Sequence, residues 1–210
     1  MKTADKILLI SLDLFNSQGE RNITSVDIAN ELDISPGNLY YHYKGKDDII
    51  NALVDRYVAK INDIPQSSGN NEDFYKYLFY CLDTMYLFRF LFQNIAEISA
   101  QYPAINTKLH RLAKFQRQYL RKCLCEQQQD GTLIGKDADI DLLLDIISLT
   151  MFQSLNYYQM QGLSLSNPDI VYRTLMTIYF SLQPYYQENS QTAKIKSAII
   201  NKTLIRPDSA

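Results

Sequence analysis

The placement of glycine and proline constrains this chain more than any other feature of its sequence. Only 7 glycines and 6 prolines occur in 210 residues, which is about half of the average usage of roughly 7% and 5%. Ten of them fall between segments in which apolar residues recur with helical spacing: Gly19, Gly37, Gly45, Pro65, Gly69, Pro103, Gly131, Gly135, Gly162 and Pro168. Because no segment of strand length alternates with a period of two, we predict an all-α fold.

The predicted helices lie between these residues or begin at one of them, except that the short helix 35–41 includes Gly37. They cover residues 4–18, 24–32, 35–41, 46–64, 72–93, 94–101, 103–128, 139–161 and 168–186. The polar connector 65–71 separates the first four helices from the rest, so we predict two domains, 1–64 and 65–210. The last stretch, 187–210, contains one apolar cluster among polar residues, and it either docks or frays.

Charge and cysteine content narrow the class of protein. The net charge of −2 gives no global reason to expect a nucleic-acid partner, and residues 1–64 carry seven Lys or Arg against ten Asp or Glu. Any case for DNA binding therefore rests on local placement. The three cysteines, Cys81, Cys123 and Cys125, fit reduced thiols better than a disulfide framework. We find no signal peptide and no stretch of about eighteen apolar residues, so we expect a cytoplasmic protein with no membrane partner, metal or cofactor.

Two short helices joined by a tight turn, 24–32 and 35–41, form a helix-turn-helix pattern that the longer first helix supports. Thr24 and Ser35 are suited to cap these helices, and Pro36 fits the first helical position. In this pattern the second short helix lies in the major groove of DNA. Its first turn lets the backbone approach the base edges, and Asn38 can make a bidentate contact with adenine.

The side chains around this reading turn are suited to hold phosphate groups. They are Tyr40, Tyr41, His42 and Lys46. Two structural alternatives stay open: a hydrogen bond within the protein for His42, and packing inside the head for the two tyrosines. For the whole set the alternative is a head that has lost DNA binding.

Residues 7–15, 24–29 and 34–46 closely resemble the DNA-binding head of TetR-family transcriptional regulators, and the resemblance covers about residues 4–55. It implies phosphate contacts from Thr24, Ser25, Tyr40, Tyr41, His42 and Lys46. It implies base reading by Ser35, Pro36, Gly37 and Asn38. The form Ser-Pro-Gly-Asn-Leu-Tyr-Tyr-His at residues 35–42 looks like a proteobacterial subgroup of the family.

The segment 74–92 is aromatic and apolar on nearly every face, which predicts a helix buried all round. It is either plain core or the wall of a ligand cavity. The resemblance implies an effector cavity among 72–93, 94–101, 103–128 and 139–161, with wall residues expected at Tyr80, Phe88, Phe92, Tyr119 and Phe152. Arg89 either pairs with Glu97 or Asp83, reaches water, or meets an anionic group of the ligand. His110 is expected on the surface or satisfied in the core.

The last two long helices, 139–161 and 168–186, each carry an apolar stripe. The stripes comprise Leu142, Ile146, Leu149, Phe152, Gln153 and Tyr157 on the first helix, and Ile170, Leu175, Ile178, Tyr179 and Leu182 on the second. The resemblance implies a homodimer through these helices, with a four-helix interface about a two-fold axis. The alternative is that both stripes pack only inside one protomer.

These features together predict a DNA-binding regulator. We expect a ligand-responsive repressor that binds a palindromic, double-stranded operator as a dimer and responds to a small, largely apolar effector; activation is the alternative mode of regulation. The sequence has no phosphate-cradling glycine loop, no nucleophile elbow and no ligand cluster, so we expect no enzymatic activity. An unmotifed helical enzyme and a helical adaptor with a degenerate head are the alternatives.

Overall fold

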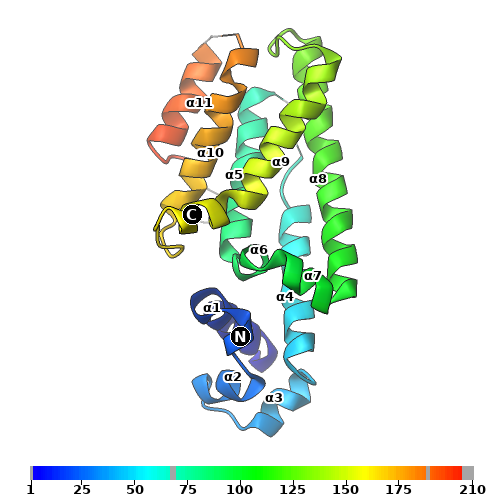
Figure 1. Ribbon diagram of the computed structural model, residues 1–210, viewed down its shortest axis with the longest axis vertical. Helices are drawn as coiled ribbons and strands as arrows, with labels where there is room; N and C mark the ends of the chain where they lie inside the picture. The colour runs from blue at the N-terminus through cyan, green and yellow to red at the C-terminus, as the bar shows by residue number, and fades with distance from the viewer. Residues whose placement is uncertain (1, 67–69, 188–189, 205–210) are drawn as a thin grey trace. The chain divides into compact units, whose positions relative to one another are not determined.

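The computed structural model of the chain describes residues 2–66, 70–187 and 190–204, and the regular elements of this part are helices joined by turns and loops (Figure 1). In these residues the only extended pairing is an isolated bridge between Leu133 and Tyr186. The elements are α1 (Thr3–Gln18), η1 (Glu20–Asn22), α2 (Ser25–Glu31), α3 (Pro36–His42), α4 (Lys46–Asn62), α5 (Asn71–Leu87), α6 (Phe90–Gln93), α7 (Ile95–Gln101), α8 (Pro103–Gln129), α9 (Asp137–Met160), α10 (Asp169–Leu182), η2 (Gln183–Tyr185) and α11 (Ser190–Ile200). The all-α prediction is confirmed. None of the described helices is long and apolar enough to cross a membrane.

The chain divides into two compact units. The first unit combines Met1–Asn62 with Phe88–Lys108, and the second combines Asp63–Leu87 with Leu109–Ala210. The first unit therefore holds α1 to α4 together with α6 and α7, which come later in the sequence. This is a division by packing, and the functional boundary between residues 64 and 65 stays a prediction.

Aromatic side chains join the two parts of the first unit. The ring of Phe90 lies 5.4 Å from that of Phe15 on α1, measured between centroids. The ring of Tyr57 on α4 lies 5.7 Å from Phe88 and 5.4 Å from Phe92. All five side chains are buried. Burial of several large aromatic residues in one place is a major contribution to the core, so segment 88–92 completes the hydrophobic core of the first unit.

The prediction of one continuous helix over residues 72–93 is wrong. α5 ends at Leu87, and α6 begins at Phe90 after a short turn. The side chain of Asn16 accepts a hydrogen bond of 3.0 Å from the backbone N–H of Phe90, one of the donors that a helix start leaves without a partner. A straight helix would point Phe88 and Phe90 about 200° apart. The break instead allows both to be buried in the first unit.

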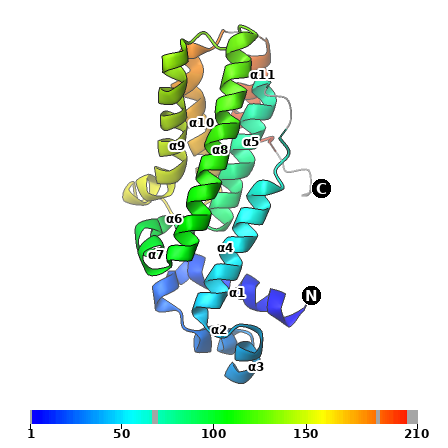
Figure 2. The same cartoon turned by 90° about the vertical axis from the view of Figure 1, so that its right-hand side faces the viewer.

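The second unit is a helical bundle in which α10 packs against α5, α9 and α11 (Figure 2). Ring pairs connect its helices: Tyr75 with Tyr179 at 5.6 Å and Phe79 with Tyr172 at 5.1 Å. The tail prediction left docking and fraying open, and α11 docks through the buried Ile195. Residues 188–189 and 205–210 of that tail lie outside the described residues.

Candidate DNA-binding interface and effector site

The start of α2 is fixed by a capping box between Thr24 and Asp27. The backbone N–H of Asp27 donates to Thr24 Oγ1 at 3.2 Å, and the backbone N–H of Thr24 donates to Asp27 Oδ2 at 2.8 Å. The Thr24 hydroxyl also donates to this carboxylate, at 2.6 Å. These hydrogen bonds lower the pKa of Asp27. The predicted N-cap role of Thr24 is confirmed, while its phosphate contact and that of the half-buried Ser25 stay predictions.

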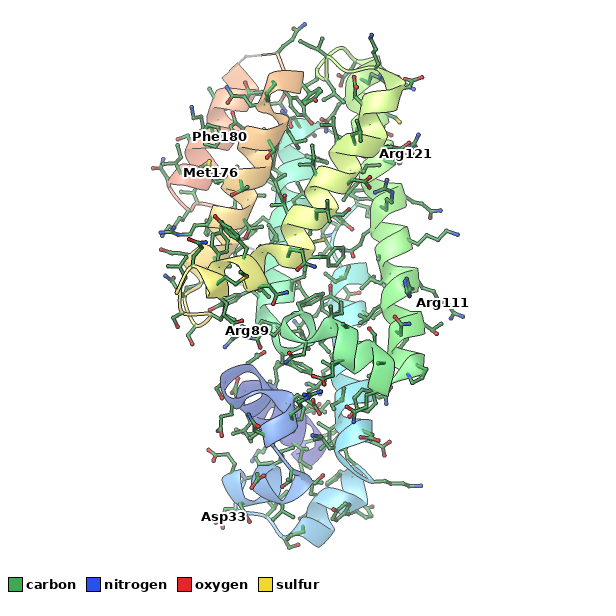
Figure 3. The ribbon with its side chains drawn as sticks, in the orientation of Figure 1. Asp33, Arg89, Arg111, Arg121, Met176 and Phe180 are labelled. Atoms are coloured by element: carbon green, nitrogen blue, oxygen red, sulfur yellow. The ribbon has the colours of Figure 1, made fainter. Side chains whose placement is uncertain are left out.

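The turn between α2 and α3 is tight because Asp33 adopts a left-handed conformation with φ of 53° (Figure 3). Asp and Asn tolerate this region better than most residues with a side chain. The backbone N–H of Ile34 then donates to the carbonyl of Ala29 at 3.0 Å. This hydrogen bond closes the turn and sets where α3 begins.

The reading turn at the start of α3 has the predicted geometry. Ser35 is the N-cap and its Oγ accepts a hydrogen bond of 3.2 Å from the backbone N–H of Asn38. Pro36 lies in the first turn, where its missing N–H costs no hydrogen bond. Leu39 is fully buried and anchors α3 by its packing, whereas Pro36, Gly37 and Asn38 are exposed. The exposed residues are therefore presented on a firmly packed helix.

The aromatic side chains that follow this turn face solvent. Tyr41 is 85% exposed and Tyr40 is exposed as well, so packing inside the head is wrong for both. His42 is half-buried, and its ring stands edge-on to that of Tyr41 with centroids 5.1 Å apart. Nothing in these positions opposes contact with a phosphate backbone, and the phosphate roles of the three residues stay predictions.

Lys46 lies in a different environment from the one its predicted role suggests. Its Nζ atom lies 2.8 Å from Glu20 Oε1 and donates to the carbonyl oxygen of Glu20 at 3.1 Å. Sequence reasoning missed this partner, because Glu20 is 26 residues away and nothing in its local pattern marks it as buried.

The six residues predicted at the effector site fall in different units. Phe88, Arg89 and Phe92 belong to the first unit, and Tyr80, Tyr119 and Phe152 to the second. Phe88 and Phe92 pack against Tyr57 on α4. The ring of Tyr119 packs against Tyr77 on α5, with centroids 4.4 Å apart. Tyr80 and Phe152 are half-buried in the second unit.

Arg89 is half-buried at the turn between α5 and α6 (Figure 3). Glu97, one of the partners considered for it, forms an ion pair with Arg21. His110 is exposed on α8, which agrees with the surface alternative.

The core of the second unit contains polar groups that the sequence prediction did not single out. The hydroxyl of Tyr186 donates to Gln127 Oε1 at 2.6 Å, and Gln116 Nε2 donates to Cys81 Sγ at 3.4 Å. Burial raises the pKa values of Tyr186 and of the Cys123 thiol. A raised thiol pKa disfavours the reactive thiolate. Among the described residues, no group of His, Cys, Asp or Glu side chains could hold a metal ion.

The outer face of α9 leaves apolar side chains uncovered. Leu142 is 63% exposed, Leu149 65% and Tyr157 57%. Beside this face lies an open groove with a cavity volume of about 360 Å³. It is lined by Leu149, Thr150, Gln153, Ser154, Tyr157, Tyr158, Thr174 and Thr177, from α9 and α10. The groove and the exposed apolar residues form one surface, which we call the α9 face.

The predicted interface stripe on α10 is wrong. Its five members, Ile170, Leu175, Ile178, Tyr179 and Leu182, are all buried within the second unit. The physical reason is that α10 packs on α5 and α11 as well as on α9, so its most apolar side is used inside the bundle. The exposed side of α10 carries Arg173, Thr177 and Phe180 instead (Figure 3 labels Phe180).

Comparison with known families identifies the class of protein that this fold and head define. Residues 7–53 match the family model of bacterial regulatory proteins of the tetR family. Residues 55–193 match the TetR family model described as a bacterial transcriptional repressor. The chain belongs to the TetR family of bacterial transcriptional regulators.

Individual relatives agree with this assignment. The chain is 31% identical over 98 residues to IcaR of Staphylococcus aureus, the negative transcriptional regulator of the biofilm operon icaADBC, covering 47% of this chain and 48% of IcaR. It is 28% identical over 125 residues to the transcriptional regulator QacR of the same organism, covering 57% of this chain and 66% of QacR. The chain thus spans about half the length of IcaR in that match.

Solved structures extend the similarity to nearly the whole fold. A TetR-family regulator from Marinobacter aquaeolei is 26% identical, with a TM-score of 0.79 over 96% of this chain and 98% of that one. The ketosteroid transcriptional regulator KstR2 of Mycobacterium tuberculosis has a TM-score of 0.68 at 20% identity, over 89% and 96% of the two chains. The second likeness concerns the fold alone.

Proposed function

We propose that this protein is a ligand-responsive transcriptional repressor that binds a palindromic operator as a homodimer. The observation that carries the proposal is the start of α3, where Pro36, Gly37 and Asn38 are exposed on a helix anchored by the buried Leu39. An exposed turn of this kind fits the major groove and brings backbone and side chain close to base edges.

The roles within the head follow from exposure and chemistry. Ser35, Pro36, Gly37 and Asn38 meet the bases, and Asn38 makes the bidentate contact with adenine. Thr24, Ser25, Tyr40, Tyr41 and His42 contact phosphates on either side of the reading turn. Lys46 belongs to the same predicted set, and in the structure its ammonium forms an ion pair with Glu20.

The α9 face supports dimerisation. Exposed leucine and tyrosine side chains beside a groove of about 360 Å³ form an apolar surface that a second copy of the chain would cover. In this proposal the two-fold axis passes beside α9 and α10. α9 supplies the apolar contacts, and α10 adds its exposed side with Thr177 and Phe180.

The effector in this proposal is a small, largely apolar molecule. Phe88 and Phe92 supply an aromatic wall for it in the first unit, and Arg89 of the same unit meets a negative charge if the ligand carries one. Because Phe88 and Phe92 pack on Tyr57 of α4, a ligand that displaces either ring also acts on α4, the helix that follows the reading helix. Repression is favoured because IcaR is a negative regulator.

Three further assignments belong to this proposal. We place the protein in the cytoplasm, where an operator is accessible, and in the proteobacterial subgroup suggested by residues 35–42. Members of the TetR family are DNA-binding regulators and not enzymes, so the family match favours the regulator over the helical-enzyme alternative.

Footprinting on the DNA upstream of the gene, combined with sedimentation of the free protein, tests the proposal. We expect a protected region with dyad symmetry and reading helices about one helical turn apart, on the order of 34–36 Å. We also expect a dimer at micromolar concentration. A footprint without a dyad, or a monomer at that concentration, would refute the dimeric repressor.

A further inference from the structure

Glu20 and Lys46 form an ion pair inside the first unit. Glu20 is only 6% exposed, although it carries a carboxylate. The Lys46 side chain is 23% exposed. Its ammonium forms an ion pair with the carboxylate of Glu20 and donates a hydrogen bond to the backbone carbonyl of Glu20. A charged residue is seldom buried unless it is paired, so Lys46 is the group that makes the burial of Glu20 possible.

Two further acidic residues follow Lys46 in the first turn of α4. Asp47 follows Lys46 directly, and its Oδ1 accepts a hydrogen bond of 3.2 Å from the hydroxyl of Tyr102. Burial, with the charges of Glu20 and Asp47, raises the pKa of Tyr102, so that side chain stays neutral. Asp48 Oδ2 accepts a hydrogen bond of 3.0 Å from the backbone N–H of Lys44. The carboxylate of Glu20 thus compensates the charge of Lys46, whereas the resemblance to other regulators implies a phosphate contact at this position.

Moving the ammonium to a phosphate would break the pair. The carboxylate of Glu20 would then remain buried without its cation, which is strongly unfavourable. The backbone carbonyl of Glu20 would also lose its donor. Both costs oppose the transfer, and the energy of a solvent-exposed phosphate contact is modest by comparison.

We propose that Glu20 withholds Lys46 from the DNA backbone and thereby sets the affinity and salt dependence of operator binding. The inference rests on the proposed function, that this head binds operator DNA. In this arrangement Glu20 is a positioning residue, because it acts on DNA only through Lys46. Lys46 links the start of α4 to η1 through its ion pair with Glu20. Each head therefore makes one fewer sequence-independent contact with a phosphate. Weak binding to unrelated DNA is the consequence.

The substitution Glu20→Gln tests the proposal, since it removes the negative charge and keeps the shape of the side chain. Each phosphate contact adds about 0.9 to the steepness of log K against log salt concentration. A dimer carries Lys46 twice, so we expect about 1.8 of added steepness in Glu20→Gln, and roughly 60-fold tighter binding at 0.1 M salt, on operator and unrelated DNA alike. Lys46→Gln as a single substitution keeps hydrogen-bond donors for Glu20. We expect it to leave the salt slope of DNA binding unchanged. When combined with Glu20→Gln, it should abolish the gain in DNA affinity and in salt slope that Glu20→Gln produces.

A matched control separates this effect from a general change in charge. Asp13 is an exposed acid on α1 in the same unit, so Asp13→Asn removes one negative charge without touching Lys46. Its salt slope should stay within about a third of the change seen for Glu20→Gln. Thermal unfolding followed by circular dichroism shows whether each variant is folded before DNA is added, and Lys46→Gln tests the proposal even if Glu20→Gln fails to fold.

The outcomes are distinguishable. If Lys46→Gln alone flattens the salt slope of the dimer by about 1.8, the lysine contacts phosphate in spite of Glu20 and the inference is overturned. If the natural protein gives a footprint with a dyad but Glu20→Gln binds no more tightly, the inference fails and the proposed function stands. If neither protein binds the upstream DNA, both are refuted.

Discussion

Truncation of Leu149 to alanine measures how much the α9 face contributes to a dimer. Leu149 is 65% exposed in one protomer. Full burial of a leucine side chain contributes roughly 1.5–3 kcal/mol, so about two-thirds of this, or roughly 1–2 kcal/mol, remains to be gained when a partner covers it. A two-fold dimer contains the residue twice, which gives roughly 2–4 kcal/mol. Because alanine keeps the β-carbon, we expect the lower part of this range, a dissociation constant raised roughly 30- to 100-fold.

Sedimentation velocity over a range of protein concentrations gives this dissociation constant. Ile134 offers a matched control, since it is also an exposed aliphatic residue of the second unit but lies in the loop before α9. Ile134→Ala should leave the dissociation constant unchanged. If Leu149→Ala has no larger effect than Ile134→Ala, the α9 face is not the interface and the reasoning from its exposure fails.

Three further predictions concern the head and the effector. Asn38→Ala should lose roughly 1–3 kcal/mol of operator affinity and relax preference at one base step, as measured by binding to operator variants; an unchanged preference would show that another residue reads the base. Because Thr24 lowers the pKa of Asp27, the capping box stabilises the fold above the unfolded pKa of about 3.9, and this contribution is lost as pH falls through the lowered folded value. The thermal stability advantage of the natural protein over Asp27→Asn should therefore shrink between pH 6 and pH 2, and a constant difference would contradict it. An apolar carboxylic acid that controls operator binding should bind the protein with different affinities in the presence and absence of operator DNA, and a 100-fold difference corresponds to about 2.7 kcal/mol of coupling. Arg89→Ala should weaken the binding of that acid to the protein. Unchanged binding would remove Arg89 from the site.

Features that depend on neighbouring residues could be predicted from the sequence. α3 begins at Pro36 after the Ser35 cap because capping chemistry is local. The same holds for Thr24 and Asp27, which are three residues apart. The exposed reading turn follows from these two starts and from the anchor at Leu39.

Features that depend on distant partners could not be predicted in this way. The break between α5 and α6 depends on Asn16, which lies 74 residues before Phe90. Apolar spacing identified a stripe on α10, but only the docking of α5 and α11 decides that this stripe faces inward. The environment of Lys46 likewise depends on the burial of Glu20. In each case the local sequence pattern is compatible with more than one packing partner, and residues far away in the sequence decide between them.

The segment that completes the first unit is synthesised late. Phe88, Phe90 and Phe92 pack on Phe15 and Tyr57, yet they follow α4 by a whole further helix. While the chain emerges from the ribosome, the helix-turn-helix therefore lacks part of its core until residues of α5 to α7 have followed. A chain cut after residue 64 would lack these phenylalanines, so the rings of Phe15 and Tyr57 would face water. For this protein the DNA-reading part cannot be isolated as an N-terminal fragment without losing the residues that finish its interior.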